Sequence, residues 1–313
     1  MFKLALNAGH SAITTRGVPA SISPKNHPNE WWLNDRIADK IQKRLAVYEG
    51  ISVLRIDDTT GQNDLSLTER TDKANAWGAD FYLAIHHNGG INGGTGGGIV
   101  AYVYTKPQEA SLSWQKELYD ALIKKTGLKG NRATPLAKQN LHEVREPAMP
   151  SVLLELGFMD SQTDVPILLT EAYADKCADA IVEVIVHRQK LKKKEEVFQK
   201  GEKSLGIYAV KRLLWMAEKL SLVPAAVADD GGFGDGTVKD VKAIQKAAKL
   251  SQTGVVNETT IRAAAELVYT TVNTTHKNAL NNLTLARSEN TALKAEVERL
   301  KKELSKAKGG KTT

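Results

Sequence analysis

The sequence is poor in cysteine and aromatic residues and has no long hydrophobic run. Its one cysteine, Cys177, excludes an internal disulfide and a zinc site made of cysteine ligands. No segment approaches the ~18 consecutive apolar residues that a membrane-spanning helix needs, so we expect no membrane insertion. The N-terminal segment turns polar too soon for a secretory signal peptide, which predicts a soluble protein made in the cytoplasm.

An excess of basic side chains limits the classes of partner. Lysine and arginine total 43 against 36 for aspartate and glutamate, which gives a net charge of +7. Such a charge favours a polyanionic partner, either nucleic acid or an anionic cell wall. The basic residues are mixed with acidic ones and form no known nucleic-acid-binding motif, so we expect no nucleic-acid partner.

Strand and helix patterns alternate up to about residue 190 and predict an α/β fold. Segments typical of buried strands lie at 3–6, 51–54, 81–85, 99–103 and 152–154. Helices are predicted from residue 30, over 67–77 and at the end of this region, where Cys177 lies on an apolar stripe and is expected in the core. This alternation favours a twisted, mainly parallel sheet flanked by helices.

The alternation of strand and helix patterns ends near residue 190, and the patterns beyond it predict a linker and two helical regions. We expect an N-terminal domain at 1–189, a charged linker at 190–204, a small three-helix domain at 205–268 and a helical tail at 269–313. The charge run in the linker is interpreted as a solvated extension rather than a nucleic-acid-binding patch.

The tail carries a heptad pattern that is typical of a coiled coil. Positions a are Leu283, Asn290, Val297 and Leu304, and positions d are Ala286, Leu293 and Leu300. Glutamates at g (Glu289 and Glu296) would face lysines at e (Lys294 and Lys301) across a parallel homodimer, and asparagine at an a position favours two strands. A frayed single helix is the alternative, because so short a heptad run is marginally stable.

Four acidic or imidazole side chains stand where a site could form. His10 follows the first predicted strand, Glu30 opens the first helix, and His86 and Glu155 end the strands at 81–85 and 152–154. In open α/β sheets, ligands bind in the crevice outside the carboxyl ends of the strands. Two histidines and one carboxylate can hold a catalytic zinc ion with one position open for water, and a further carboxylate can take a proton from that water.

Each of these residues could also have a purely structural role, with no part in a site. His10 could be an ordinary loop residue, and Glu30 could simply favour the positive end of a helix. His86 and His87 are neighbours on a strand, so at most one of them is expected to enter the site. Glu155 is the most informative, because a carboxylate directly after an apolar strand is costly to bury without compensation. Spacing alone does not establish that the four residues converge.

Five ordered motifs then identify a family resemblance over residues 1–188. They are Ala8-Gly9-His10, residues 29–34, residues 67–70 with Ala74-Asn75, residues 84–88 and residues 150–158. Together they resemble the zinc-dependent N-acetylmuramoyl-L-alanine amidases, α/β enzymes that cleave the amide between N-acetylmuramic acid and L-alanine in peptidoglycan. The resemblance implies that His10, Glu30 and His86 are zinc ligands and that Glu155 is the catalytic glutamate.

The same resemblance places some residues outside the usual pattern. Ala84 and His87 stand where that family usually has serine and alanine, so His87 is a competing candidate for the ligand position of His86. His142 lies in a segment similar to the one before the glutamate strand, where it could contact substrate or lie in solvent.

The second domain resembles the three-helix peptidoglycan-binding domain of wall hydrolases, through residues 233–237, 241–245 and 253–260. An amidase joined to such a domain resembles the layout of phage endolysins, which stay in the cytoplasm of a Gram-positive host until release. A bacterial autolysin or sporulation amidase, a zinc peptidase or deacetylase, and a wall-binding protein without activity are the alternatives.

Overall fold

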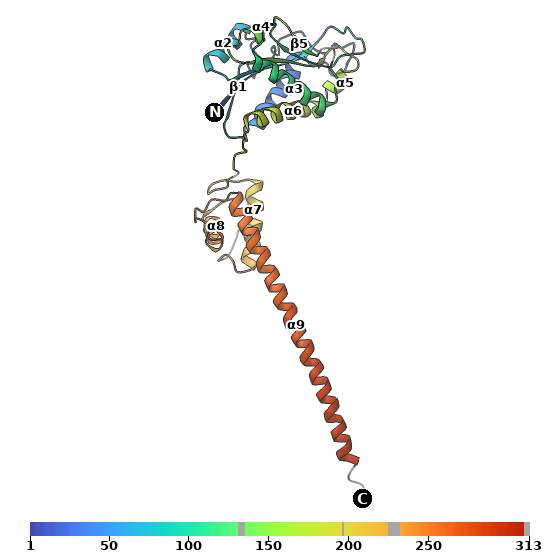
Figure 1. Ribbon diagram of the computed structural model, residues 1–313, viewed down its shortest axis with the longest axis vertical. Coiled ribbons are helices and arrows are strands. Elements are labelled where there is room, and N and C mark those ends of the chain that lie inside the picture. The colour runs from blue at the N-terminus through green and yellow to red at the C-terminus, as the bar shows by residue number, and fades with distance from the viewer. Residues whose placement is uncertain (131–134, 196, 225–231, 310–313) are drawn as a thin grey trace. The chain divides into compact units, whose positions relative to one another are not determined.

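The chain forms two compact units, Met1–Lys194 and Glu195–Thr313, in a computed structural model. The structure describes residues 1–130, 135–195, 197–224 and 232–309 (Figure 1). Residue 196 of the predicted linker, residues 225–231 of the predicted helical domain and residues 310–313 of the predicted tail lie outside the described residues. Among the described helices, none is both long and apolar enough to cross a membrane.

The first unit is built on a six-stranded sheet with the order β2-β1-β3-β6-β4-β5, counted over the described residues. The strands are β1 (Phe2–Ala8), β2 (Ile51–Arg55), β3 (Phe81–Asn88), β4 (Ile99–Val103), β5 (Leu136–Lys138) and β6 (Ser151–Phe158). The strands β2, β1, β3 and β6 run parallel, whereas β4 pairs antiparallel with β6 and parallel with β5. The predicted mainly parallel sheet is therefore confirmed.

Helices cover both faces of this sheet (Figure 1). One face packs against α1 (Glu30–Leu45), α3 (Glu109–Thr126) and α6 (Glu171–Gln189), and the other against α2 (Leu67–Trp77) and α4 (His142–Arg145). A short helix, α5 (Val165–Leu168), precedes α6. Cys177 is buried in the core on the α6 side, as its stripe predicts. Successive residues of each strand alternate between the two cores, as side chains of a strand must.

Strands β3 and β6 continue beyond the segments that the sequence predicts. His86 and Glu155 therefore lie within β3 and β6, and the expectation that they end their strands is wrong. The apolar residues at 156–158 keep β6 paired with both neighbours past Glu155, which explains the extension. Both side chains still lie near the carboxyl end of the parallel strands.

The second unit contains α7 (Leu205–Lys219), α8 (Asp235–Ala247) and α9 (Glu258–Gly309). Its core joins Val210 and Leu214 of α7, Val241 and Ile244 of α8, and Ala264 at the start of α9. In the structure, α9 continues without interruption from this core into the predicted tail. The last helix of the helical domain and the tail are therefore a single helix. Apolar side chains farther along α9 are exposed, among them Leu283, Leu293, Val297 and Leu300.

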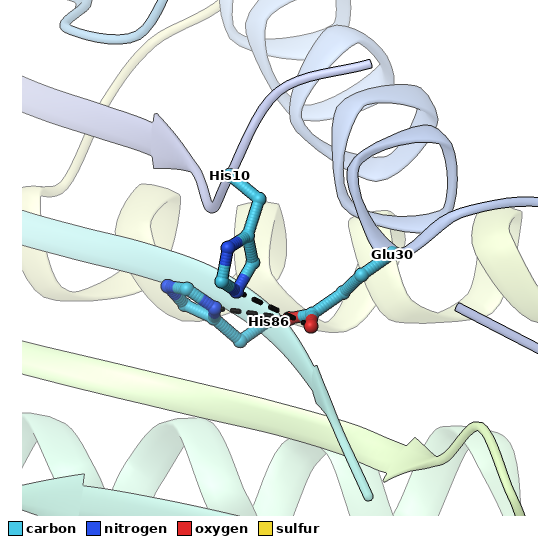
Figure 2. A group of neighbouring side chains, drawn as sticks. All are labelled: His10, Glu30 and His86. Atoms are coloured by element: carbon cyan, nitrogen blue, oxygen red, sulfur yellow. Dashed lines mark hydrogen bonds and ion pairs between the residues drawn. The ribbon is translucent and has the colours of Figure 1, made fainter. Parts of the chain in front are cut away.

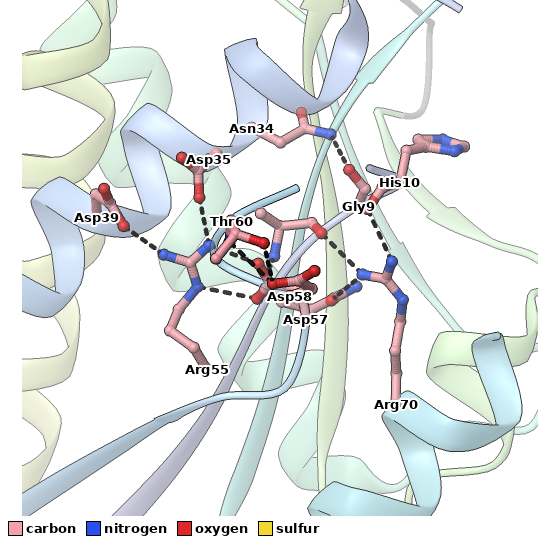
Figure 3. A network of polar contacts seen from close by, with 12 residues as sticks. Gly9, His10, Asn34, Asp35, Asp39, Arg55, Asp57, Asp58, Thr60 and Arg70 are labelled. Atoms are coloured by element: carbon pink, nitrogen blue, oxygen red, sulfur yellow. Dashed lines mark hydrogen bonds and ion pairs between the residues drawn. The ribbon is translucent and has the colours of Figure 1, made fainter. Parts of the chain in front are cut away.

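A buried arginine joins β1, α2 and the segment after β1. Arg70 is 1% exposed, and its guanidinium donates to the side chain of Asn7 at 2.6 Å and to the carbonyl of Ala8 at 2.9 Å. It also donates to the carbonyl of His10 at 2.8 Å (Figure 3). His10 has a φ of 66°, in the left-handed region that non-glycine residues rarely adopt. Arg70 therefore holds the backbone of His10 in an unfavourable conformation.

We expect the substitution Arg70→Met to lower the free energy of unfolding of the first unit by about 3 kcal/mol, because it leaves buried carbonyl oxygens without a donor. Urea unfolding measures this loss. Arg145→Met is the matched control, since the ion pair of Arg145 with Glu146 lies at the surface. An equal loss in both variants would contradict the role given to Arg70.

Candidate functional site

Three of the predicted site residues come together at one edge of the sheet (Figure 2). His10 comes from the loop after β1, Glu30 is the first residue of α1, and His86 lies on β3. One ligand atom from each lies within 4.8 Å of the other two. His10 Nε2 lies 3.2 Å from Glu30 Oε2, and His86 Nδ1 lies 3.1 Å from Glu30 Oε1. The two imidazoles therefore face one carboxylate.

The N-terminus of α1 positions Glu30 in this group. Asn29 caps the helix, because its side chain accepts a hydrogen bond from the backbone N–H of Trp32. Glu30 is 1% exposed, and burial by itself would raise the pKa of its carboxyl group. The hydrogen bonds and charges of His10 and His86 outweigh burial and hold that pKa well below its ordinary value. Glu30 is therefore an ionised carboxylate in a buried position.

The neighbouring histidines of β3 point to opposite faces of the sheet. His87 Nδ1 lies 2.7 Å from Asn34 Oδ1 on α1, and the side-chain amide of Asn34 donates to the carbonyl of Gly9. Burial lowers the pKa of His87 to about 3, so this imidazole is neutral. The structure thus brings His86 and not His87 to the cluster. His87 instead positions Asn34, and through it the loop that carries His10.

Gly9 allows the close approach of His10 and His86. A Cβ atom at this position would lie 2.0 Å from the imidazole Cε1 of His86, so no larger residue fits without moving the histidine. This contact explains why glycine stands next to His10.

The structure places Glu155 beside the cluster. It is paired with His86 in the register of β3 and β6, and its Oε2 atom is buried with no hydrogen-bond partner among the described residues. Burial raises the pKa of Glu155 to about 8, with the charge of His86 opposing the shift and that of Glu30 adding to it. A carboxyl group with this pKa can gain and lose a proton near neutral pH.

Sequence reasoning missed Glu143, which contacts the far side of His86. Glu143 lies on α4, is 4% exposed, and its Oε2 atom lies 2.9 Å from His86 Nε2. Burial would raise the pKa of Glu143, but the charge and hydrogen bond of His86 hold it below its ordinary value. Its neighbour His142 instead lies 3.2 Å from the hydroxyl of Thr71 on α2. The only sequence signal was an acidic residue between the apolar residues Leu141 and Val144.

A cavity of about 250 Å³ opens beside the cluster. It lies between the start of α2 and the sheet, and its lining residues are Asn7, His10, Asp64, Leu65, Ser66, Leu67, Arg70, His86 and Glu143. Pockets with a few convergent polar groups are typical of ligand sites. The cavity therefore gives a small polar ligand access to His10 and His86.

The donor set fits a zinc ion. Two imidazole nitrogens and one carboxylate oxygen are ligands that zinc prefers in catalytic sites, and three protein ligands leave one position open. Glu30 Oε2 is buried, and it lies within ion-pair distance of two basic groups, His10 Nε2 at 3.2 Å and Arg16 Nε at 3.4 Å, so this carboxylate already attracts cations. The charges that raise the pKa of His86 above its ordinary value, despite burial, would equally favour a divalent cation among these residues.

Comparison with known proteins assigns both parts of the chain to families. Residues 4–187 match the family model described as N-acetylmuramoyl-L-alanine amidase, and residues 208–264 match that of a putative peptidoglycan binding domain. The first match spans more than half of the 313 residues, so the chain belongs to the N-acetylmuramoyl-L-alanine amidase family.

Individual relatives match part of the chain. A sporulation-specific N-acetylmuramoyl-L-alanine amidase of Bacillus subtilis is 35% identical over 131 residues, 42% of this chain and 48% of that protein. An endolysin of Bacillus phage SPP1 is 34% identical over 133 residues, 41% of this chain and 47% of its own length. The chain thus spans about half the length of these curated relatives.

A solved structure gives the same fold. The catalytic domain of CwlV, an N-acetylmuramoyl-L-alanine amidase from Bacillus (Paenibacillus) polymyxa var. colistinus, superposes with a TM-score of 0.54 at 26% identity. The match covers 61% of this chain and 100% of that domain.

Proposed function

We propose that this protein is a zinc-dependent N-acetylmuramoyl-L-alanine amidase, which hydrolyses the amide bond between the lactyl group of N-acetylmuramic acid and L-alanine in peptidoglycan. The observation that carries the proposal is the cluster of His10, Glu30 and His86, with a carboxylate oxygen of Glu155 beside it that has no hydrogen-bond partner among the described residues. Membership of the amidase family supports the choice of bond.

His10, Glu30 and His86 would hold the zinc ion through one ligand atom each. When bound, zinc supplies Lewis acidity, which lowers the pKa of water and polarises a carbonyl oxygen. Glu155 accepts a proton from the attacking water and passes it to the leaving amine of L-alanine. Two features suit it to this role: burial raises its pKa, and its Oε2 atom has no hydrogen-bond partner among the described residues. The cavity between α2 and the sheet receives the substrate next to His10 and His86, which line it.

Product analysis of Gram-positive cell walls tests the reaction. We expect new free amino groups on L-alanine, no new reducing sugar ends, and loss of activity with a zinc chelator followed by recovery on adding zinc. Amines freed elsewhere would indicate a peptidase or deacetylase. Binding without products would indicate a wall-binding protein, and would overturn the proposed activity.

The same assay separates the roles of the site residues. We expect Glu155→Gln to keep bound zinc and lower kcat by at least about 10³-fold, whereas His10→Ala reduces zinc content itself. Metal analysis of the purified variants measures the difference. An active Glu155→Gln variant would remove this residue from the proposed proton transfer.

We further propose that the amidase is a phage endolysin that lyses a Gram-positive host from within, with a bacterial autolysin or sporulation enzyme as the alternative. The likeness to the endolysin of Bacillus phage SPP1 supports the endolysin, and the likeness to the sporulation-specific amidase supports the alternative.

Expression inside a Gram-positive host distinguishes the two roles. We expect cells that contain the protein to grow normally and to lyse within minutes once their membrane is permeabilised. Cells that contain the Glu155→Gln variant are the control and should stay intact. Wall degradation before permeabilisation would contradict the endolysin and favour an exported autolysin.

The second unit is proposed to hold the enzyme on the wall as a parallel homodimer. The matched peptidoglycan-binding family supports wall binding. The exposed stripe of Leu283, Leu293, Val297 and Leu300 along α9 supports dimerisation, because a second copy of the helix would bury it. Two linked binding domains raise the effective concentration of the enzyme on a repeating polymer.

Matched substitutions in the full chain test this arrangement. We expect Leu293→Lys, at a d position, to convert a dimer into a monomer in sedimentation and to weaken binding to purified walls by at least ~10-fold. Thr291→Lys, on the side of the helix away from the stripe, should change neither property. A wild-type monomer at high concentration would refute the dimer, and wall binding by residues 1–194 alone as tight as that of the full chain would refute the binding role.

A further inference from the structure

The two ring nitrogens of His86 face two different carboxylates. Nδ1 lies 3.1 Å from Glu30 Oε1, within the cluster with His10, and Nε2 lies 2.9 Å from Glu143 Oε2. We propose that Glu143 is a positioning residue, which holds the proton of His86 on Nε2 and so makes Nδ1 the metal-binding atom. This inference rests on the proposed zinc site and adds a residue outside its ligand set.

Glu143 can only accept at this contact, because an ionised carboxylate has no proton to donate. A neutral His86 therefore carries its proton on Nε2, and the lone pair of Nδ1 points toward Glu30 and His10. Histidine ligands of metals usually donate their second N–H to such an acceptor, which orients the ring and raises the basicity of the ligand atom.

Three hydrogen bonds fix the carboxylate in this orientation. While Oε2 faces His86, Oε1 accepts from the side-chain amide of Asn7 and from the hydroxyl of Tyr82 at 2.8 Å. The amide of Asn7 cannot turn over, because its oxygen accepts from Arg70 at 2.6 Å. Arg70 thus orients Asn7, and Asn7 orients Glu143.

These contacts separate the role of Glu143 from that of Glu155. Both oxygens of Glu143 are occupied by donors of the protein, whereas Glu155 Oε2 has no hydrogen-bond partner among the described residues. Glu143 is therefore unsuited to take a proton from water, and its effect on the reaction passes through His86.

The substitution Glu143→Gln tests the proposal while keeping the size of the side chain. If the amide oxygen faces Asn7 and Tyr82, the NH₂ group faces His86 Nε2 and forces the proton onto Nδ1. If the amide is turned over, its NH₂ group meets the donor of Asn7. The first arrangement removes the lone pair from Nδ1, and the second keeps it only by setting two N–H donors against each other. We therefore expect zinc affinity to fall 10–100-fold, the usual effect of losing such a contact.

Competition with a chromophoric chelator measures zinc affinity in the full chain, independently of activity. Glu146→Gln is the matched control, because Glu146 is the nearest glutamate in sequence and pairs with Arg145 at the surface. Nitrogen NMR of ¹⁵N-histidine-labelled, zinc-loaded protein adds a readout that a merely structural role would not move. It should find Nδ1 of His86 bound to zinc and the proton on Nε2 in the wild type, and a shifted Nε2 resonance in Glu143→Gln, where an amide replaces the carboxylate acceptor.

Asn7→Asp provides a second variant, in case Glu143→Gln does not fold. It removes the donor to Glu143 and sets two carboxylates side by side, so we expect weaker zinc binding in the same direction. A folded variant of either kind that binds zinc as tightly as the wild type overturns the proposal. A wild type that binds no zinc instead overturns the proposed metal site, so the two failures are distinguishable.

Discussion

The parallel register of β1, β3 and β6 is the constraint on which the site depends. Ala8 pairs with Ile85, and His86 pairs with Glu155, so the residues that follow β1 lie beside the ends of the other two strands. A slip of one residue in β3 would turn His86 into the α1 core and bring His87 to the site. Apolar side chains packed on both faces of the sheet hold this register.

Charge is distributed unevenly around the two imidazoles of the cluster. Glu30 and Glu143 stay ionised because His86 lies between them. Glu155 is paired with His86 in the register of β3 and β6, but its Oε2 atom has no hydrogen-bond partner among the described residues. Burial therefore raises its pKa to about 8. Residues of one chemical type thus acquire different properties from their surroundings. In the proposed function, this difference separates a ligand, a positioning residue and a proton carrier.

Much of the fold could be predicted because its signals are local. The helix at 67–77 and the strand at 99–103 occur with the predicted bounds, since hydrophobic periodicity and capping residues mark them. Helix α3 and the short elements β5 and α4 were not predicted. Three- and four-residue elements such as β5 and α4 carry too few residues for a period to show, and their conformation depends on packing against the sheet.

The candidate site was predictable only where a residue was unusual in its own segment. Glu155 stood out as a charge after an apolar strand. Glu143 lies on one turn of helix, and its side chain contacts Asn7 of β1 and Tyr82 and His86 of β3. Asn7 and Glu143 are separated by 136 residues, and no local pattern reports such a contact. The contact nevertheless has a clear physical cause, because the amide of Asn7 accepts from the cation Arg70 and donates to the anion Glu143. A residue with only one of these capacities at position 7 would remove one hydrogen bond from a buried charged group, either Arg70 or Glu143.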